Sequence, residues 1–92
     1  ILKSNIGIEE ELARVRYYPQ PMTNKVVFDG LTNIDALKIQ IMDVSGRMLR
    51  AEEVLASNGK FEVDVANLSN GVYVFVLSWA DYSTSIKLIK HE

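Results

Sequence analysis

The sequence predicts an all-β domain, an immunoglobulin-like antiparallel β-sandwich of about seven strands. Short runs of alternating apolar residues recur along the chain, and turn-forming residues separate them at close intervals. No segment shows a convincing helical period, which argues against a parallel α/β sheet with crossover helices. With 92 residues, the chain is long enough for one domain with a single core.

The run at residues 67–79 is the most hydrophobic stretch, and we expect it to contain the central strand. Turn-forming residues open this run, and β-branched and aromatic residues follow without interruption. Both alternating sets are apolar, which is typical of a strand covered on both faces. A sandwich strand has only one inward face, so we expect one of the two sets, either Val72, Val74 and Val76 or Tyr73, Phe75 and Leu77, to form an exposed apolar stripe.

The remaining strands follow from alternation and from the residues that interrupt it. In chain order, the predicted strands cover residues 14–18, 25–29, 37–42, 47–55, 61–65, 72–77 and 82–90. Residues 1–13 are interpreted as a linker, with a helical turn as the alternative, which leaves residues 14–92 for the folded domain. Pro19 and Pro21 cannot donate ladder hydrogen bonds, so the first strand should lie at a sheet edge and lead into a stiff, extended connector.

Two turns have a specific chemistry. The Asp43 carboxylate is expected to accept a hydrogen bond from the backbone N–H of Ser45, while Gly46 supplies a permissive φ. Asn58-Gly59 is the strongest two-residue hairpin signal, because both turn positions need positive φ. The apolar faces of the strands and the turn before the central strand predict a core that contains Phe28, Ile39, Ile41, Phe61, Val63 and Leu68.

Residues that support catalysis or metal binding are sparse. The sole histidine, His91, is the penultimate residue, so we expect neither an activated nucleophile nor an enzyme. The aspartates in predicted turns match no calcium loop, and the glycosylation pattern at residues 67–69 is explained by the turn that it forms. A net charge of −2 gives no attraction for nucleic acid. We therefore predict no catalytic residue, no cofactor, no metal and no nucleic-acid partner.

Two groups of polar and aromatic residues each have two interpretations. Trp79 and Tyr82, with the tyrosines at residues 17–18, form either an aromatic platform for sugars or peptide or, as we favour, packing over a sandwich end. Lys87 and Lys90 are either docking charges or charges that protect an edge strand from unwanted pairing. Residue chemistry alone favours edge protection.

Five short motifs occur in a distinctive order. They are Tyr18-Pro19-Gln20-Pro21, Asp43-Val44-Ser45-Gly46-Arg47, Val63-Asp64-Val65-Ala66-Asn67-Leu68, Gly71-Val72-Tyr73 and Lys87-Leu88-Ile89-Lys90. Together they make residues 15–90 resemble the C-terminal sorting domain of type IX secretion cargo. The sequence departs from the family pattern at Gln20, where the family usually has Asn.

The resemblance implies a non-enzymatic sorting signal that directs an attached passenger protein through an outer-membrane translocon of Bacteroidota-type bacteria. The implied route runs through the periplasm to the outer-membrane surface or the medium, and a sortase-like cysteine protease then usually removes the domain. The implied partners are the translocon, its shuttle proteins and, in retained members, anionic lipopolysaccharide. The apolar stripe is expected to be covered by the linker, by a second copy through self-association or by the transport machinery.

The resemblance also suggests roles for individual residues. Recognition by the translocon is expected to involve Gly71, Tyr73, Lys87, Leu88, Ile89 and Lys90. Structural roles are expected for Tyr18, Pro19, Pro21, Asp43, Gly46 and Leu68.

Two other functions remain open at the level of sequence. The chain is also similar to the C-terminal domain that some surface components of the secretion apparatus retain. A fibronectin-like adhesive or sugar-binding module is the alternative from a different class. Position in the parent protein is expected to separate them, because a sorting domain closes its chain, whereas an adhesive module can lie in the middle.

Overall fold

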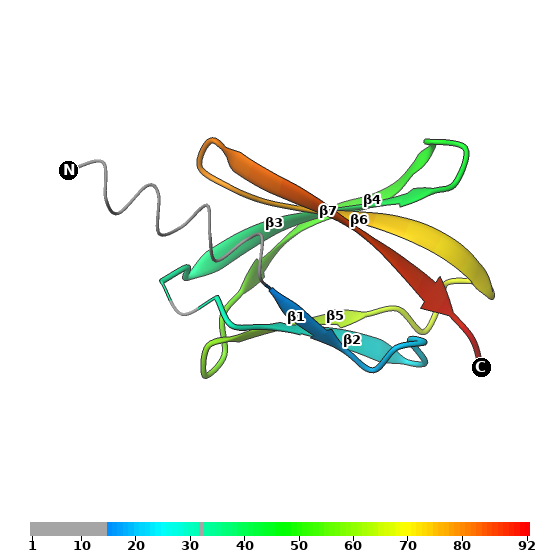
Figure 1. Ribbon diagram of the computed structural model, residues 1–92, viewed down its shortest axis with the longest axis horizontal. Helices are drawn as coiled ribbons and strands as arrows, with labels where there is room; N and C mark the ends of the chain where they lie inside the picture. The colour runs from blue at the N-terminus through cyan, green and yellow to red at the C-terminus, as the bar shows by residue number, and fades with distance from the viewer. Residues whose placement is uncertain (1–14, 32) are drawn as a thin grey trace.

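The computed structural model describes residues 15–31 and 33–92 and contains seven β-strands in two antiparallel sheets, as predicted. The strands are β1 (Arg16–Tyr18), β2 (Lys25–Asp29), β3 (Ala36–Asp43), β4 (Met48–Leu55), β5 (Lys60–Asp64), β6 (Gly71–Trp79) and β7 (Tyr82–Lys90). One sheet has the order β1-β2-β5 and the other β4-β3-β6-β7, and Figure 1 shows the two stacked as layers. This architecture is an immunoglobulin-like sandwich. In the described ranges, no helix is long and apolar enough to cross a membrane.

The core lies between the two sheets and is built from the inward face of each strand. Phe28 of β2 and Phe75 of β6 join the layers, with ring centroids 5.9 Å apart and planes tilted by 47°. Five of the six predicted core residues are buried, and these are Phe28, Ile39, Ile41, Phe61 and Val63. The prediction for Leu68 is wrong: its side chain is half-buried and packs against the rim of the core, because the turn that carries it lies outside both sheets.

Strand β6 is central in its sheet, with β3 and β7 as neighbours. Its inward side chains, Tyr73, Phe75 and Leu77, are buried. On the outer face Val74 and Val76 are half-buried and Val72 is 36% exposed, so the predicted apolar stripe is the valine set and is partly exposed. The prediction that β6 is covered on both faces is wrong for the described residues, because no further layer lies over this sheet.

The tight turn between β4 and β5 has the predicted conformation. Asn58 and Gly59 have φ values of 56° and 76°, and the Ser57 N–H donates to the Lys60 carbonyl at 2.8 Å. Positive φ at both central positions matches the right-handed twist of the flanking strands. The sequence signal therefore fixes this connection locally.

The connector after β1 differs from its prediction. Residues 19–21 form bends rather than an extended segment, and the peptide bonds before Pro19 and Pro21 are both cis. Strand β1 does lie at a sheet edge, as expected for a strand that runs into prolines. The bends bring Met22 beside the last strand, where it forms a parallel bridge with Lys90.

Candidate recognition site

The motifs that are scattered along the sequence meet at one end of the sandwich, which we call the motif end. It consists of residues 18–22, 43–47, 63–73 and 87–92. Asp43 pairs with Tyr73 across β3 and β6, and Tyr73 pairs with Leu88 across β6 and β7. In Figure 1 the β3–β4 hairpin, the start of β6, the β1–β2 connector and the C-terminus all lie at the right of the molecule.

The first and last motifs bind each other directly. The Met22 N–H donates to the Ile89 carbonyl at 2.7 Å, and the His91 N–H donates to the Met22 carbonyl at 2.9 Å. The Ile89 N–H donates to the Gln20 side-chain oxygen at 3.3 Å. Gln20, the position that departs from the family pattern, thus contacts the last motif through its amide.

Lys90 is a structural residue, and neither interpretation of its charge from the sequence is correct. Its side chain is buried, with the residue 1% exposed, so it serves neither as a docking charge nor as an edge-protecting charge. The Lys90 Nζ donates to the Leu68 carbonyl at 2.7 Å and lies 3.6 Å from a carboxylate oxygen of Glu92. A buried ammonium requires such partners because its desolvation is costly. The contact ties the last motif to the turn before β6.

Two further hydrogen bonds hold the turn before β6. The Tyr73 hydroxyl donates to the Ser69 carbonyl at 2.6 Å, and the Glu92 N–H donates to the Asn70 side-chain oxygen at 3.1 Å. Tyr73 is buried, and its phenol oxygen is therefore paired as expected. Together these contacts make the C-terminal residues part of the fold.

The β3–β4 turn is organised by one carboxylate, as predicted. Asp43 Oδ1 accepts hydrogen bonds from the Ser45 N–H at 3.0 Å and the Ser45 hydroxyl at 2.6 Å, and Gly46 has a φ of 90°. The sequence did not predict the part that Arg47 plays in this turn: its N–H donates to the same oxygen at 3.0 Å, and its Nε lies 3.2 Å from Oδ2. The Ser45 hydroxyl and the Arg47 N–H lower the pKa of Asp43 below its ordinary value.

The six residues expected to take part in recognition divide into two sets. Tyr73, Leu88 and Lys90 are buried, so they support the motif end from inside. Gly71, Lys87 and Ile89 are exposed and remain available to a partner. Lys87 projects from the outer face of the sheet beside Val74, with which it pairs.

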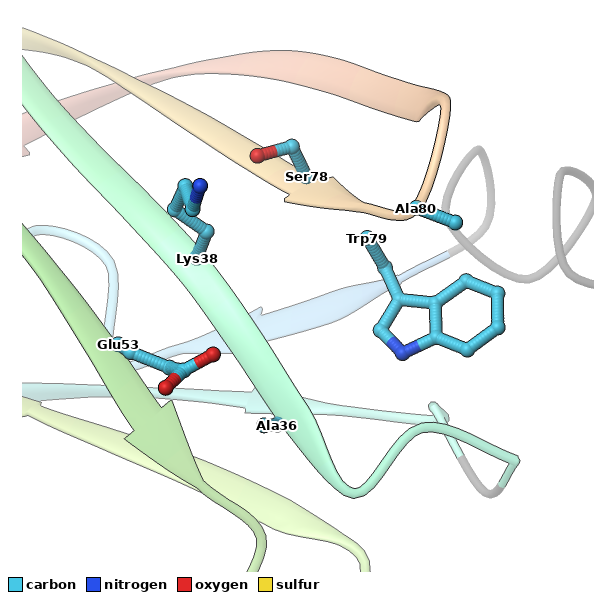
Figure 2. A pocket seen from close by; sticks show the side chains of 6 residues that line it. All are labelled: Ala36, Lys38, Glu53, Ser78, Trp79 and Ala80. Carbon is cyan, nitrogen blue, oxygen red and sulfur yellow. The ribbon is translucent and has the colours of Figure 1, made fainter.

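A surface depression lies at the end of the sandwich opposite to the motif end, beside the β6–β7 hairpin (Figure 2). This open depression has a volume of about 370 Å³ and is lined by Ala36, Lys38, Glu53, Ser78, Trp79 and Ala80. Trp79 and Tyr82 are half-buried and pack against the core, which supports packing over a sandwich end rather than an aromatic platform. No motif residue lines the depression.

These features define a small immunoglobulin-like sandwich whose signature residues gather at one end. The chain belongs to the secretion-system C-terminal sorting domain family, whose model matches residues 16–91. It is thus a C-terminal sorting signal of type IX secretion, which interacts with the secretion machinery and serves export across the outer membrane to the surface or the medium. A comparison with curated proteins found no match.

Proposed function

We propose that this domain is recognised as a folded unit at its motif end, where the translocon and its shuttle proteins bind it in the periplasm. The observation that carries this proposal is the contact between the first and last motifs, since Met22 and Ile89 meet only in the folded chain. A partner that reads this surface distinguishes the folded domain from an unfolded chain with the same sequence.

The direction of the chain is compatible with this role. Strand β1 runs toward the motif end, so its first residue is the one farther from that end (Figure 1). A passenger attached before the domain therefore leaves the motif end accessible. In the proposed sequence of events, a sortase-like cysteine protease cleaves ahead of the domain after export and releases it from the passenger.

The proposal is tested by fusing residues 1–92 behind a periplasmic reporter in a host with a type IX system. The matched variant is Leu88→Asp, which places a carboxylate at a fully buried position and unfolds the domain without shortening it. We expect the parent fusion to reach the surface and the variant to remain in the periplasm. A host that lacks the translocon is the control.

Each alternative has its own outcome in this assay. Export of the Leu88→Asp fusion would show that a linear signal is read rather than a folded surface. A parent fusion that stays in the periplasm would contradict the proposed function itself. If the domain stays attached to the reporter at the surface, the domain is retained after export and is not removed by a protease. Point variants are preferable to truncation at residue 85, because truncation also removes Ile86 and Leu88 from the core.

A further inference from the structure

Strand β7 is an edge strand with a regular backbone. It pairs with β6 over nine successive positions, from Gly71↔Lys90 to Trp79↔Tyr82, without a register shift. Both backbone polar groups of Ile89 point away from β6, because its N–H reaches Gln20 and its carbonyl reaches Met22. In an antiparallel pair such outward residues alternate with residues bonded to the neighbouring strand. Ser83, Ser85 and Lys87 therefore also direct their N–H and C=O groups outward.

These outward groups are unpaired within residues 15–31 and 33–92. No backbone hydrogen bond from another described segment reaches Ser83, Ser85 or Lys87. At Ile89 the edge is already occupied, because Met22 adds to it in a parallel bridge. The chain thus shows that this edge can pair with another backbone segment, and the open part begins where the bound connector ends.

The other edge strands, β1, β5 and β4, have sequence or backbone features that disfavour the addition of a further strand. Strand β1 has three residues and runs into Pro19, and β5 has a charged side chain at every second position. Strand β4 carries Arg50 and Glu52 on its inward face, 2.9 Å apart, and its pairing with β3 contains a bulge. Short strands, prolines, inward charges and bulges all protect an edge. Strand β7 has none of these between residues 82 and 87.

The side chains along the open edge suit a strand partner. Ser83 and Ser85 are small and lie on the outer face of the sheet, so they leave room for the side chains of an added strand. Lys87 is the one charged residue among residues 82–89. A lone lysine disfavours a like-charged neighbour and favours a carboxylate at the opposing position.

We propose that the open edge of β7, from Ser83 to Lys87, binds an extended strand of a secretion-machinery protein that places a carboxylate opposite Lys87. This inference rests on the proposed function and extends the recognised surface from Lys87, at the motif end, along the edge of β7 to Ser83. Main-chain hydrogen bonds to three outward residues supply the binding, and Lys87 sets the register of the added strand.

The test uses a proline at an outward position, in the same reporter fusion. Ser85→Pro removes an outward N–H and leaves the β6–β7 ladder intact, because proline is tolerated on an edge strand whose N–H faces solvent. Ser85→Ala, the matched control, keeps the N–H. We expect surface delivery to fall about tenfold or more for Ser85→Pro, as loss of a main-chain hydrogen bond and the added ring predict, and to be unchanged for Ser85→Ala.

The register is tested separately with Lys87→Glu. Pairing with a carboxylate predicts loss of delivery, whereas simple edge protection predicts full delivery, because glutamate protects an edge as well as lysine does. Val76→Thr changes the outer face beside Ser85 without changing the edge, and we expect it to be delivered normally. Full delivery of Lys87→Glu, or loss of delivery for Val76→Thr, would contradict edge pairing in this register.

Folding is checked by amide hydrogen exchange on the purified chain. We expect the N–H groups of Ser83, Ser85 and Lys87 to exchange quickly, while those bonded to β6 remain protected. Slow exchange at the three outward amides would show that the edge is already occupied and would overturn the proposal.

If Ser85→Pro fails to fold, Ser83→Pro makes the same test at the start of the strand. Equal delivery of the parent and a folded proline variant would also overturn the proposal, whereas failure of the parent fusion would contradict the proposed function.

Discussion

At the scale of single residues, two lysines in one motif have opposite environments. Lys87 is exposed on the sheet surface, whereas Lys90 is buried and bonded to the Leu68 carbonyl. Three residues apart on a strand, the two side chains point to opposite faces. A charge reversal at both positions would therefore combine a surface effect with a core effect.

We expect Lys90→Glu to destabilise the domain by about 3–5 kcal/mol, the cost of leaving a buried charge without its partner. The new carboxylate would face the Leu68 carbonyl and Glu92, which both repel it. Lys87→Glu should change the free energy of unfolding by less than about 0.5 kcal/mol, as is usual at the surface. Urea unfolding of the two variants measures both values. A Lys90→Glu protein as stable as the parent would show that the buried contact does not hold the motif end together.

The Asp43 turn should make stability depend on pH in a defined direction. Its hydrogen bonds lower the pKa of the folded carboxyl below the ordinary value of 3.8, so its contribution is present above that value and is lost as the pH falls through the folded pKa. We expect Asp43→Asn to melt at a lower temperature than the parent at about pH 7, with the difference shrinking at about pH 2.5. Thermal unfolding at both pH values measures it. If the difference in melting temperature between the two proteins does not change with pH, the shape of the side chain and not its charge explains the loss of stability.

At the scale of elements, the strands follow from local patterns in the sequence. Alternation placed β3 and β5 within a residue or so of their observed ends, and the range of β7 is the predicted one. Asn58-Gly59 fixes its hairpin because the conformation depends on these two residues alone. The existence and type of each strand could therefore be predicted, because period and turn chemistry act over short distances.

The features that sequence reasoning missed depend on contacts between distant segments. The partners of Lys90 are 22 residues away at Leu68 and two residues away at Glu92, and no periodic signal links them. Likewise, Gln20 meets Ile89 across 69 positions of the chain. The motif residues themselves were identified from the resemblance, but their convergence at one end required the sheet topology.

At the scale of the whole molecule, the outer face of the four-stranded sheet carries a continuous apolar band. Cross-strand pairs join Met48 to Met42, Met42 to Val74, and Val72 to Ile89. Met48 is 50% exposed and Ile89 is 46% exposed, so part of the band faces solvent. Exposed patches of this kind are usually interaction surfaces. This face is distinct from the edge of β7, so the two can be tested independently.

We expect the free domain to self-associate weakly through this band, because burial of the apolar side chains against a second copy removes them from water. The double variant Met48→Thr/Ile89→Thr should remain monomeric, since it makes the two most exposed members of the band polar. The control is Leu55→Thr, which changes an apolar side chain that is 72% exposed outside the band. Sedimentation velocity across a range of concentrations measures the effect: the sedimentation coefficient of the parent and of the control should rise with concentration, and that of the double variant should stay constant.

If the parent is monomeric at every concentration, a second copy does not cover the band. If the control also loses association, the contact between copies includes Leu55 and is not confined to the band. Ser85→Pro should associate like the parent, because its change lies on the strand edge.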